Sequence, residues 1–151
     1  MSWKARLPLL SAALWWGSLS AIGFMAVPLL FSHAGSPAQA GRLAAELFGG
    51  QVWLSLACGL FILVGARDED GTPQLSWAGG ALAYVLLGVL MALLQEFALA
   101  PRIVARQNLA MWHSLGTAVY AVQWLCALVV LWKVTGMRPS SEEGGNPGPL
   151  D

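Results

Sequence analysis

The feature that most constrains this chain is a set of four long apolar blocks, at residues 7–31, 47–66, 75–98 and 109–134. An α-helix needs about 20 apolar residues to cross a hydrocarbon core about 30 Å thick, and each block is long enough to do so. With 57% hydrophobic and only 11% charged residues, the chain falls outside the usual range of soluble domains. The blocks predict an all-α integral membrane protein, an antiparallel bundle of four transmembrane helices forming one domain over residues 1–135. Ala38-Gln39-Ala40 is similar to a signal-peptide cleavage site, but the first block exceeds the about 7–15 apolar residues of a signal, which favours an uncleaved helix.

The hydrophilic segments between the blocks predict connections and orientation. Residues 67–73 are charged and contain Gly and Pro, which predicts a short turn between antiparallel neighbours. Lys and Arg are more frequent on the side that holds the N-terminus, the second loop and the C-terminal end, and this bias predicts both termini in the cytoplasm. They are Lys4, Arg6, Arg67, Lys133 and Arg138, against Arg42, Arg102 and Arg106 on the other side. Residues 136–151 are rich in Pro, Gly, Ser and Glu, which predicts a disordered cytoplasmic tail.

Small and polar residues recur on one face of each block and predict the inner surface of the bundle. Helices in lipid associate through close packing of small residues and through occasional hydrogen bonds, so each helix needs such a face. The faces are Gly17, Ser20, Ala21 and Phe24; Gln51, Ser55, Cys58 and Gly59; Gly80, Tyr84, Gly88, Met91 and Gln95; and Gly116, Thr117, Tyr120, Gln123 and Ala127, close to His113. These polar groups are interpreted either as structural hydrogen bonds or as the lining of a polar cavity for a ligand or ion.

Ionisable side chains in or near the spans are candidates for function because charge is costly in a bilayer. Glu96 either pairs with Arg102 or Arg106 at the interface or takes part in a site. His113 either caps a neighbouring backbone group or serves as a metal ligand, a haem ligand or a proton relay. With His33, these residues could form a site of two histidines and one carboxylate. His33 and His113 are therefore the candidate metal ligands, although no motif spacing fixes them on one face.

Three runs of residues carry a family resemblance. They are residues 23–31, residues 40–48, and residues 106–116, the last reading Arg-Gln-Asn-Leu-Ala-Met-Trp-His-Ser-Leu-Gly. In their order they resemble the transmembrane protein 205-like family, whose bacterial members carry a domain of unknown function numbered 4149. The resemblance implies a small multi-pass protein of the bacterial inner membrane with no established reaction and no catalytic residues to carry over.

The residues that match the family's motifs include Pro28, Arg106 and His113, and all lie near one predicted membrane face. Pro28 removes a backbone donor and is expected to open the end of the first helix. Pro101, after the third block, stands in a similar context. Paired proline-interrupted helix ends in two halves of a chain are typical of some transporter sites.

These observations predict a non-enzymatic membrane protein, either a scaffold or a transporter-like unit that works as a homo-oligomer in the lipid bilayer. No cofactor is predicted. The alternatives are a haem- or copper-binding four-helix membrane protein and a membrane enzyme acting on a lipid or isoprenoid. Eight basic residues balance eight acidic ones, so no nucleic-acid partner is expected. The candidate functional residues are Pro28, His33, Glu96, Arg106, His113, Thr117 and Tyr120.

Overall fold

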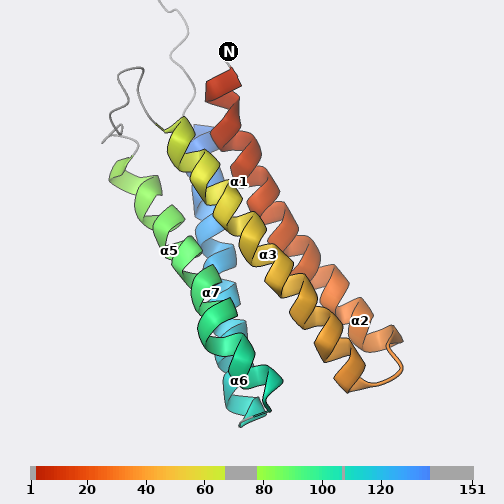
Figure 1. Cartoon of the computed structure of the whole chain (residues 1–151). Coiled ribbons are helices and arrows are strands. Elements are labelled where there is room, and N and C mark those ends of the chain that lie inside the picture. Colours follow the sequence, from red (N-terminus) through yellow and green to blue (C-terminus); the bar gives the residue numbers. More distant parts are fainter. Residues whose placement is uncertain (1–2, 67–77, 107, 137–151) are drawn as a thin grey trace, which may run out of the picture.

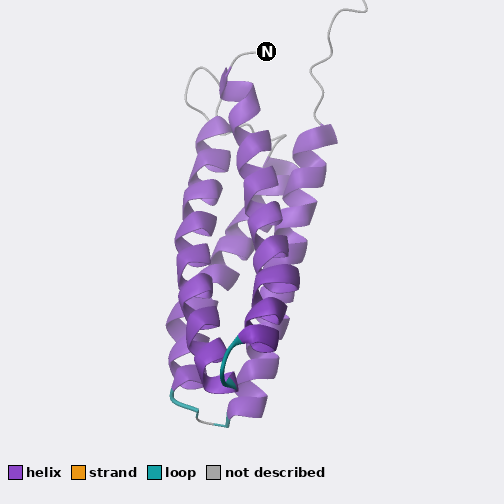
Figure 2. Ribbon diagram, turned by 90° about the vertical axis from the view of Figure 1, so that its right-hand side faces the viewer, coloured by secondary structure: helices purple, strands orange, loops and turns teal. Residues whose placement is uncertain are grey.

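A computed structural model describes residues 3–66, 78–106 and 108–136 of the chain. Every element in these ranges is helical, and none is a strand (Figure 2). The charged run at 67–73 and the predicted tail beyond Gly136 lie outside the described residues. The prediction of an all-α membrane bundle is confirmed, because four helices are long and apolar enough to cross a membrane, with mean hydropathies between 1.6 and 2.0.

Within the described residues, nine helical segments join into four rods (Figure 1). The first rod consists of α1 (Trp3–Ala21), the π-helical turn η1 (Ile22–Ala26) and α2 (Val27–His33). The second is α3 (Pro37–Gly65), and the fourth is α7 (Leu109–Gly136). The third consists of η2 (Ala78–Leu82), α5 (Ala83–Leu93), the π-helical turn η3 (Leu94–Leu99) and α6 (Ala100–Val104). The rods run alternately up and down, so the described ends at Trp3 and Gly136 lie at the same end of the bundle (Figure 1).

The second helix begins ten residues before the predicted span at 47–66. Ser36 caps it, because its hydroxyl accepts a hydrogen bond from the Gln39 backbone N–H at 3.2 Å, and Pro37 follows at the first position, where its missing N–H costs nothing. The polar residues Arg42 and Glu46 concealed this start, since they interrupt the apolar run. Glu46 is consequently a second carboxylate on a spanning helix, one that the sequence analysis placed outside the span.

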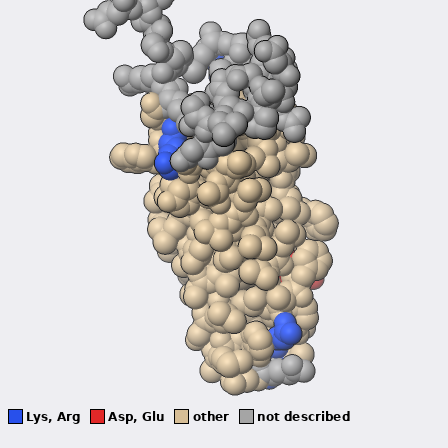
Figure 3. Space-filling view, turned by 90° about the vertical axis from the view of Figure 1, so that its left-hand side faces the viewer, with Lys and Arg blue, Asp and Glu red and all other residues tan. Residues whose placement is uncertain are grey.

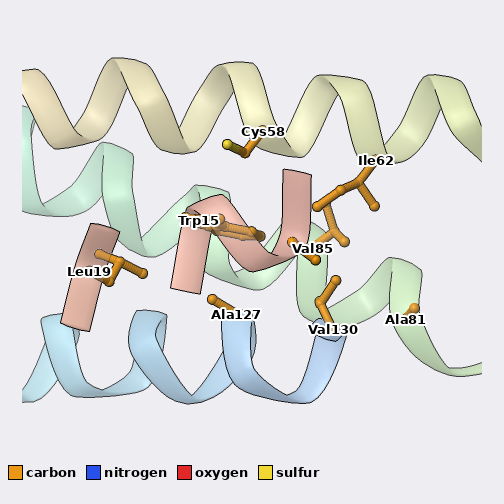
Figure 4. Close-up of a cluster of buried hydrophobic side chains, with 9 residues drawn as sticks. Trp15, Leu19, Cys58, Ile62, Ala81, Val85, Ala127 and Val130 are labelled. Atoms are coloured by element: carbon orange, nitrogen blue, oxygen red, sulfur yellow. The ribbon is translucent and has the colours of Figure 1, made fainter. Parts of the chain in front are cut away.

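The rods pack in a ring in which α3 and α7 each lie beside both α1 and α5. The hydrophobic core lies toward the end that holds α1, η2 and the end of α7. Figure 4 shows Trp15 lying across this core between the helices, near Cys58 and Val85. A Cβ placed on Gly88 would come within 2.8 Å of the Trp15 ring, so Gly88 provides the space that the indole fills. The core thus pairs a large side chain on one helix with a glycine on another.

The first of the four predicted inner faces is wrong. Gly17, Ala21 and Phe24 are exposed, and α1 instead turns Ala12, Trp15 and Leu19 inward. Burying Trp15 gives more contact area than burying a row of small residues, which explains the rotation. On α3 the predicted face is correct, since all four of its residues are buried. The other two faces are partly correct, because Tyr84 and Thr117 are exposed.

The opposite end of the bundle is packed differently. No residue of η1, α2 or α6 is buried. Nearer the end of the bundle that holds Trp3, α3, α5 and α7 each contribute several buried residues. On the face that Figure 3 shows, Lys and Arg of the described residues lie near the two ends, and a broad band without them lies between. This distribution places the ends of the rods at the headgroups and the band in the hydrocarbon. The bundle therefore has a packed half and a half with broken helices.

Candidate functional site

Two of the rods change helical geometry immediately before a proline. The π-helical turn η1 precedes Val27-Pro28, and η3 precedes Ala100-Pro101. A proline cannot donate to the carbonyl four residues earlier, and its ring pushes that carbonyl away, so a widened turn accommodates it. At these turns the hydrogen bonds reach five residues back, from the Val27 N–H to the Ile22 carbonyl and from the Ala100 N–H to the Gln95 carbonyl. The first rod continues beyond Pro28 to His33.

The two breaks lie at the same depth in the membrane. Trp15 of the first rod packs against Gly88 of the third, and these two rods run in the same direction. Gly88 follows Trp15 by 73 positions in the chain, and Pro101 follows Pro28 by the same number. The turns η1 and η3 therefore lie at a similar level along the bundle. The similarity between the two proline segments in the sequence is therefore also a similarity in space.

A polar layer crosses the interior just above the breaks. The amide of Gln51 donates to Ser18 Oγ at 2.9 Å and approaches Ser55 Oγ at 3.4 Å, and Gln123 Nε2 donates to Ser55 Oγ at 3.0 Å. Both serine hydroxyls already donate to backbone carbonyls, Ser18 to Trp15 and Ser55 to Gln51. The serine oxygens can therefore only accept, which requires both glutamines to present Nε2 to them.

This arrangement leaves the Gln51 amide oxygen without a hydrogen-bond partner among the residues that the structure describes. Gln51 is only 3% exposed, so the oxygen lies well away from the surface. A buried carbonyl oxygen without a donor is costly in a medium of low dielectric constant. A group that carries N–H or O–H donors, or a positive charge, would relieve that cost.

Gln95 of η3 presents a second such oxygen. Its side chain is 9% exposed, and its Nε2 lies against Gly116 of α7. Within the described part of the chain, its Oε1 has no hydrogen-bond partner. The next residue, Glu96, points toward α3, where a Cβ on Gly49 would lie 3.7 and 3.8 Å from its carboxylate oxygens. Because α3 and η3 are antiparallel, this contact brings Gln51 and Gln95 to within about one residue of the same depth.

Tyr120 joins three rods at this level. Its hydroxyl donates to the Leu19 carbonyl at 2.8 Å, and its ring meets Phe48 edge-on with centroids 5.2 Å apart. Gly23 of η1 allows the close approach, since a Cβ there would lie 2.9 Å from the Tyr120 ring. Tyr120 is thus a packing residue beside the polar layer, which is a structural role for one of the predicted candidates.

The other predicted candidates lie on the outside of this end of the bundle. His33 is exposed, and its Nδ1 lies 2.7 Å from Ser32 Oγ and 3.1 Å from the Leu29 carbonyl. His113 and Thr117 are also exposed, with the threonine hydroxyl donating to the His113 carbonyl at 2.9 Å. Arg106 is exposed and has a positive φ of 55°. The described residues contain no group of three or more His, Cys, Asp or Glu side chains that could hold a metal ion. They therefore do not bring His33, Glu96 and His113 together as a metal site.

Glu96 and Arg102 lie against different parts of the bundle. Arg102 donates to the Ala98 carbonyl, and its guanidinium lies 4.8 Å from the centre of the Trp112 ring. Glu96 instead faces Gly49. The carboxylate is thus directed into the contact between two rods, whereas the arginine is held at the end of the bundle.

Sequence reasoning placed Gln51 and Gln95 on inner faces but did not select them as site residues. Their position was visible in the sequence, yet the unpaired oxygen of Gln51 follows from the directions of the Ser18 and Ser55 hydroxyls, which only the folded chain shows. The family model described as a domain of unknown function (DUF4149) matches residues 10–113, a range that contains both glutamines, both breaks and His113. No curated protein and no solved structure matches the chain.

Proposed function

This chain belongs to the DUF4149 family, and we propose that it is a non-enzymatic, transporter-like membrane unit with a polar ligand site near the middle of the bilayer. The observation that carries the proposal is the proximity, within about two helical turns along the bundle, of two π-helical turns, two prolines and two buried glutamines with unpaired oxygens. Transporter sites are typically built where membrane helices are interrupted, because the freed backbone groups and polar side chains meet the ligand there.

The packed half explains how such a site would be gated. Trp15, Ile62 and Val85 are completely buried and fill the bundle above the polar layer, so we infer that the route on that side is closed. The half below it contains the two breaks and has no buried residue in η1, α2 or α6. In the proposal, a ligand enters from the end that holds His33 and Arg106, and the broken rods move relative to the packed half.

The proposed membrane location, orientation and oligomeric state are those expected from the sequence. We propose the bacterial inner membrane as the location, with both termini in the cytoplasm, which the Lys and Arg bias supports. We also propose a homo-oligomer, since the packed half of one bundle leaves no continuous route and a second copy would have to contribute to one. The kinship with the wider transmembrane protein 205-like group remains a resemblance.

Cysteine labelling in reconstituted vesicles tests the proposal. Gly49→Cys places a thiol beside Glu96 at ordinary contact distances. The native Cys58 and Cys126 are buried in the packed half, so the wild-type chain is the internal control. A membrane-impermeant maleimide should label Gly49→Cys and leave the wild type unlabelled. Ser32→Cys, at an exposed position near the end of the rod, verifies that the reagent works. If Ser32→Cys reacts and Gly49→Cys stays as unreactive as the wild type, the proposed access route is wrong.

A further inference from the structure

We propose that a second copy of this chain binds to the outer face of α3, so that the two α3 helices run side by side as a parallel, two-fold symmetric pair. This inference rests on the proposed function, whose homo-oligomer it provides with an interface. It follows from the spacing of the exposed residues of α3, from a carboxylate that this face exposes to lipid and from the fit of its large and small side chains.

Seven residues of α3 turn outward at alternating spacings of three and four positions. These residues, which we call the α3 seam, are Leu43, Glu46, Gly50, Trp53, Ala57, Leu60 and Val64. All are exposed except Ala57, which is half-buried, and α3 lies at the front of the bundle in Figure 1. Such a spacing is typical of helices that pack along their length as a left-handed pair, which is the usual crossing in membrane bundles. The seam therefore has the pattern of a helix contact on a face that its own bundle leaves open.

Glu46 places a carboxylate on this face within the hydrocarbon. A helix of 29 residues is about 43 Å long, so α3 exceeds a core of about 30 Å by about 7 Å at each end. Glu46 lies about 14 Å from Pro37 along the axis, inside the core, and among the described residues it is the one exposed carboxylate. Ionisable groups within a membrane are almost always turned toward protein or water. The carboxylate therefore indicates that another chain covers this face.

Arg42 gives the same face a charge that complements Glu46. It is exposed and lies one helical turn before Glu46. A two-fold axis along the membrane normal places each residue at the depth of its counterpart, so Arg42 of one copy lies about 6 Å along the axis from Glu46 of the other. Two arginines and two glutamates then form a neutral cluster enclosed by protein. A face that neutralises its own charge in this way favours a second copy over a different partner.

The middle of the seam offers a large side chain and the space to receive it. Trp53 is 66% exposed and lies two residues from the centre of α3, although amphipathic rings favour the headgroup region. In a parallel pair, a residue at its position fits between the partner residues three before and four after it, here Gly50 and Ala57. A Cβ added to Gly50 meets no atom within 4 Å, so its own bundle does not use this space. The pair would repeat between copies the fit of Trp15 against Gly88.

The second copy would also border the proposed access route. Gly49, which faces the Glu96 carboxylate of η3, lies at the edge of the seam next to Gly50. The second α3 would therefore form the outer wall of this route.

Intermolecular disulfide formation in reconstituted vesicles tests the interface. Gly50→Cys and Gly17→Cys are a matched pair, because both replace exposed helical glycines with nothing within 4 Å of an added Cβ. With copper phenanthroline as the oxidant, we expect Gly50→Cys to form a covalent dimer at a low protein-to-lipid ratio. Gly17→Cys and the wild type, whose cysteines are buried, should form none. Equal cross-linking at both glycines, or at neither, would overturn the proposal.

Subunit counting tests the residues that hold the pair together. Chains labelled at Ser32→Cys are diluted with lipid until the photobleaching steps per vesicle fall from two to one. Trp53→Ala should separate at about tenfold less dilution. Phe24→Ala, at a similarly exposed aromatic position, should behave like the unsubstituted chain.

Charge reversal in the same assay tests the ion pairing. Glu46→Arg should separate the pair, and adding Arg42→Glu should restore it, because the double change returns the cluster to neutrality. Circular dichroism should show native helix content in every variant. A double variant that stays as monomeric as Glu46→Arg would mean that the two charges do not meet across the interface.

The outcomes separate this interface from the proposed function. If Gly50→Cys does not cross-link while Gly49→Cys is labelled by the maleimide, the α3 interface is wrong and the transporter-like unit remains. If Gly50→Cys cross-links while Gly49→Cys stays unlabelled, the pair forms but the access route is wrong. If neither reacts, both proposals fail.

Discussion

The two halves of this bundle are built from the same apolar composition but are packed by different means. In one half, Trp15 fits against Gly88, and completely buried aliphatic side chains surround it. In the other, the first and third rods each pass through a π-helical turn and a proline, and η1, α2 and α6 have no buried residue. The comparison teaches that small residues stabilise a membrane bundle where a large side chain meets them. Where prolines interrupt the rods, polar groups with free acceptors are found instead.

The largest expected effect is loss of the central indole of the packed half. Trp15→Ala should lower the free energy of unfolding by about 3–5 kcal/mol, because it removes the contacts of a fully buried ring and leaves a cavity. Phe24→Ala, at a 68% exposed position in η1, should change it by less than about 1 kcal/mol. Unfolding in mixed micelles with increasing sodium dodecyl sulfate measures both. Equal losses would mean that the two halves do not differ in packing.

Adding a methyl group tests the same pairing from the other side. Gly88→Ala should destabilise the bundle by about 1–3 kcal/mol, since its Cβ would lie 2.8 Å from the Trp15 ring and both helices are held in place. Gly17→Ala should be neutral or stabilising by up to about 1 kcal/mol, because no atom lies within 4 Å of its added Cβ and alanine favours a helix. The same unfolding assay measures both variants. If Gly17→Ala destabilised the bundle more than Gly88→Ala, a different face of α1 would have to point into the core.

The polar layer should contribute a smaller amount. Ser55→Ala removes the oxygen that accepts from both Gln51 and Gln123, and we expect a loss of about 1 kcal/mol. Ser32→Ala, which removes an exposed hydroxyl that bonds only its own helix and a neighbouring ring, should have no measurable effect. If Ser55→Ala is also without effect, the hydroxyl does not fix the orientation of the glutamine amides.

The smallest effect on stability is expected at the breaks. Replacing Pro28 and Pro101 by Ala together should change the free energy of unfolding by less than about 1 kcal/mol, because the π-helical turns already accommodate both rings. The same change should slow the labelling of Gly49→Cys, since the restored N–H groups allow regular helices through the opening. Unchanged labelling would show that the prolines do not control access.

Much of the fold could be predicted from the sequence, because a span in lipid is defined by a continuous apolar run. The start of the second helix could not, since Arg42 and Glu46 interrupt that run while Ser36 and Pro37 still cap a helix. The inner face of the first helix was predicted wrongly because small residues were expected to line the helix contacts. Which face turns inward depends on the fit between Trp15 and a glycine 73 positions away in the chain.

The candidate site was predictable only in part. The repeated proline context at Pro28 and Pro101 indicated where the π-helical turns lie, and Gln51 and Gln95 stood on predicted inner faces and are buried. The free oxygen of Gln51 depends on where the hydroxyl protons of Ser18 and Ser55 are donated, which no sequence pattern encodes. The histidines were predicted as metal ligands because of their residue type, yet both are exposed and lie outside the bundle interior.

Hydrogen–deuterium exchange of the reconstituted protein tests the difference between the halves most directly. Backbone amides open to exchange where packing is weak, even inside regular helices. The account predicts that amides of residues 22–33 and 94–104 exchange much faster than those of residues 10–20 and 83–93 in the same two rods. Uniform protection along both rods would contradict the existence of a broken, mobile half.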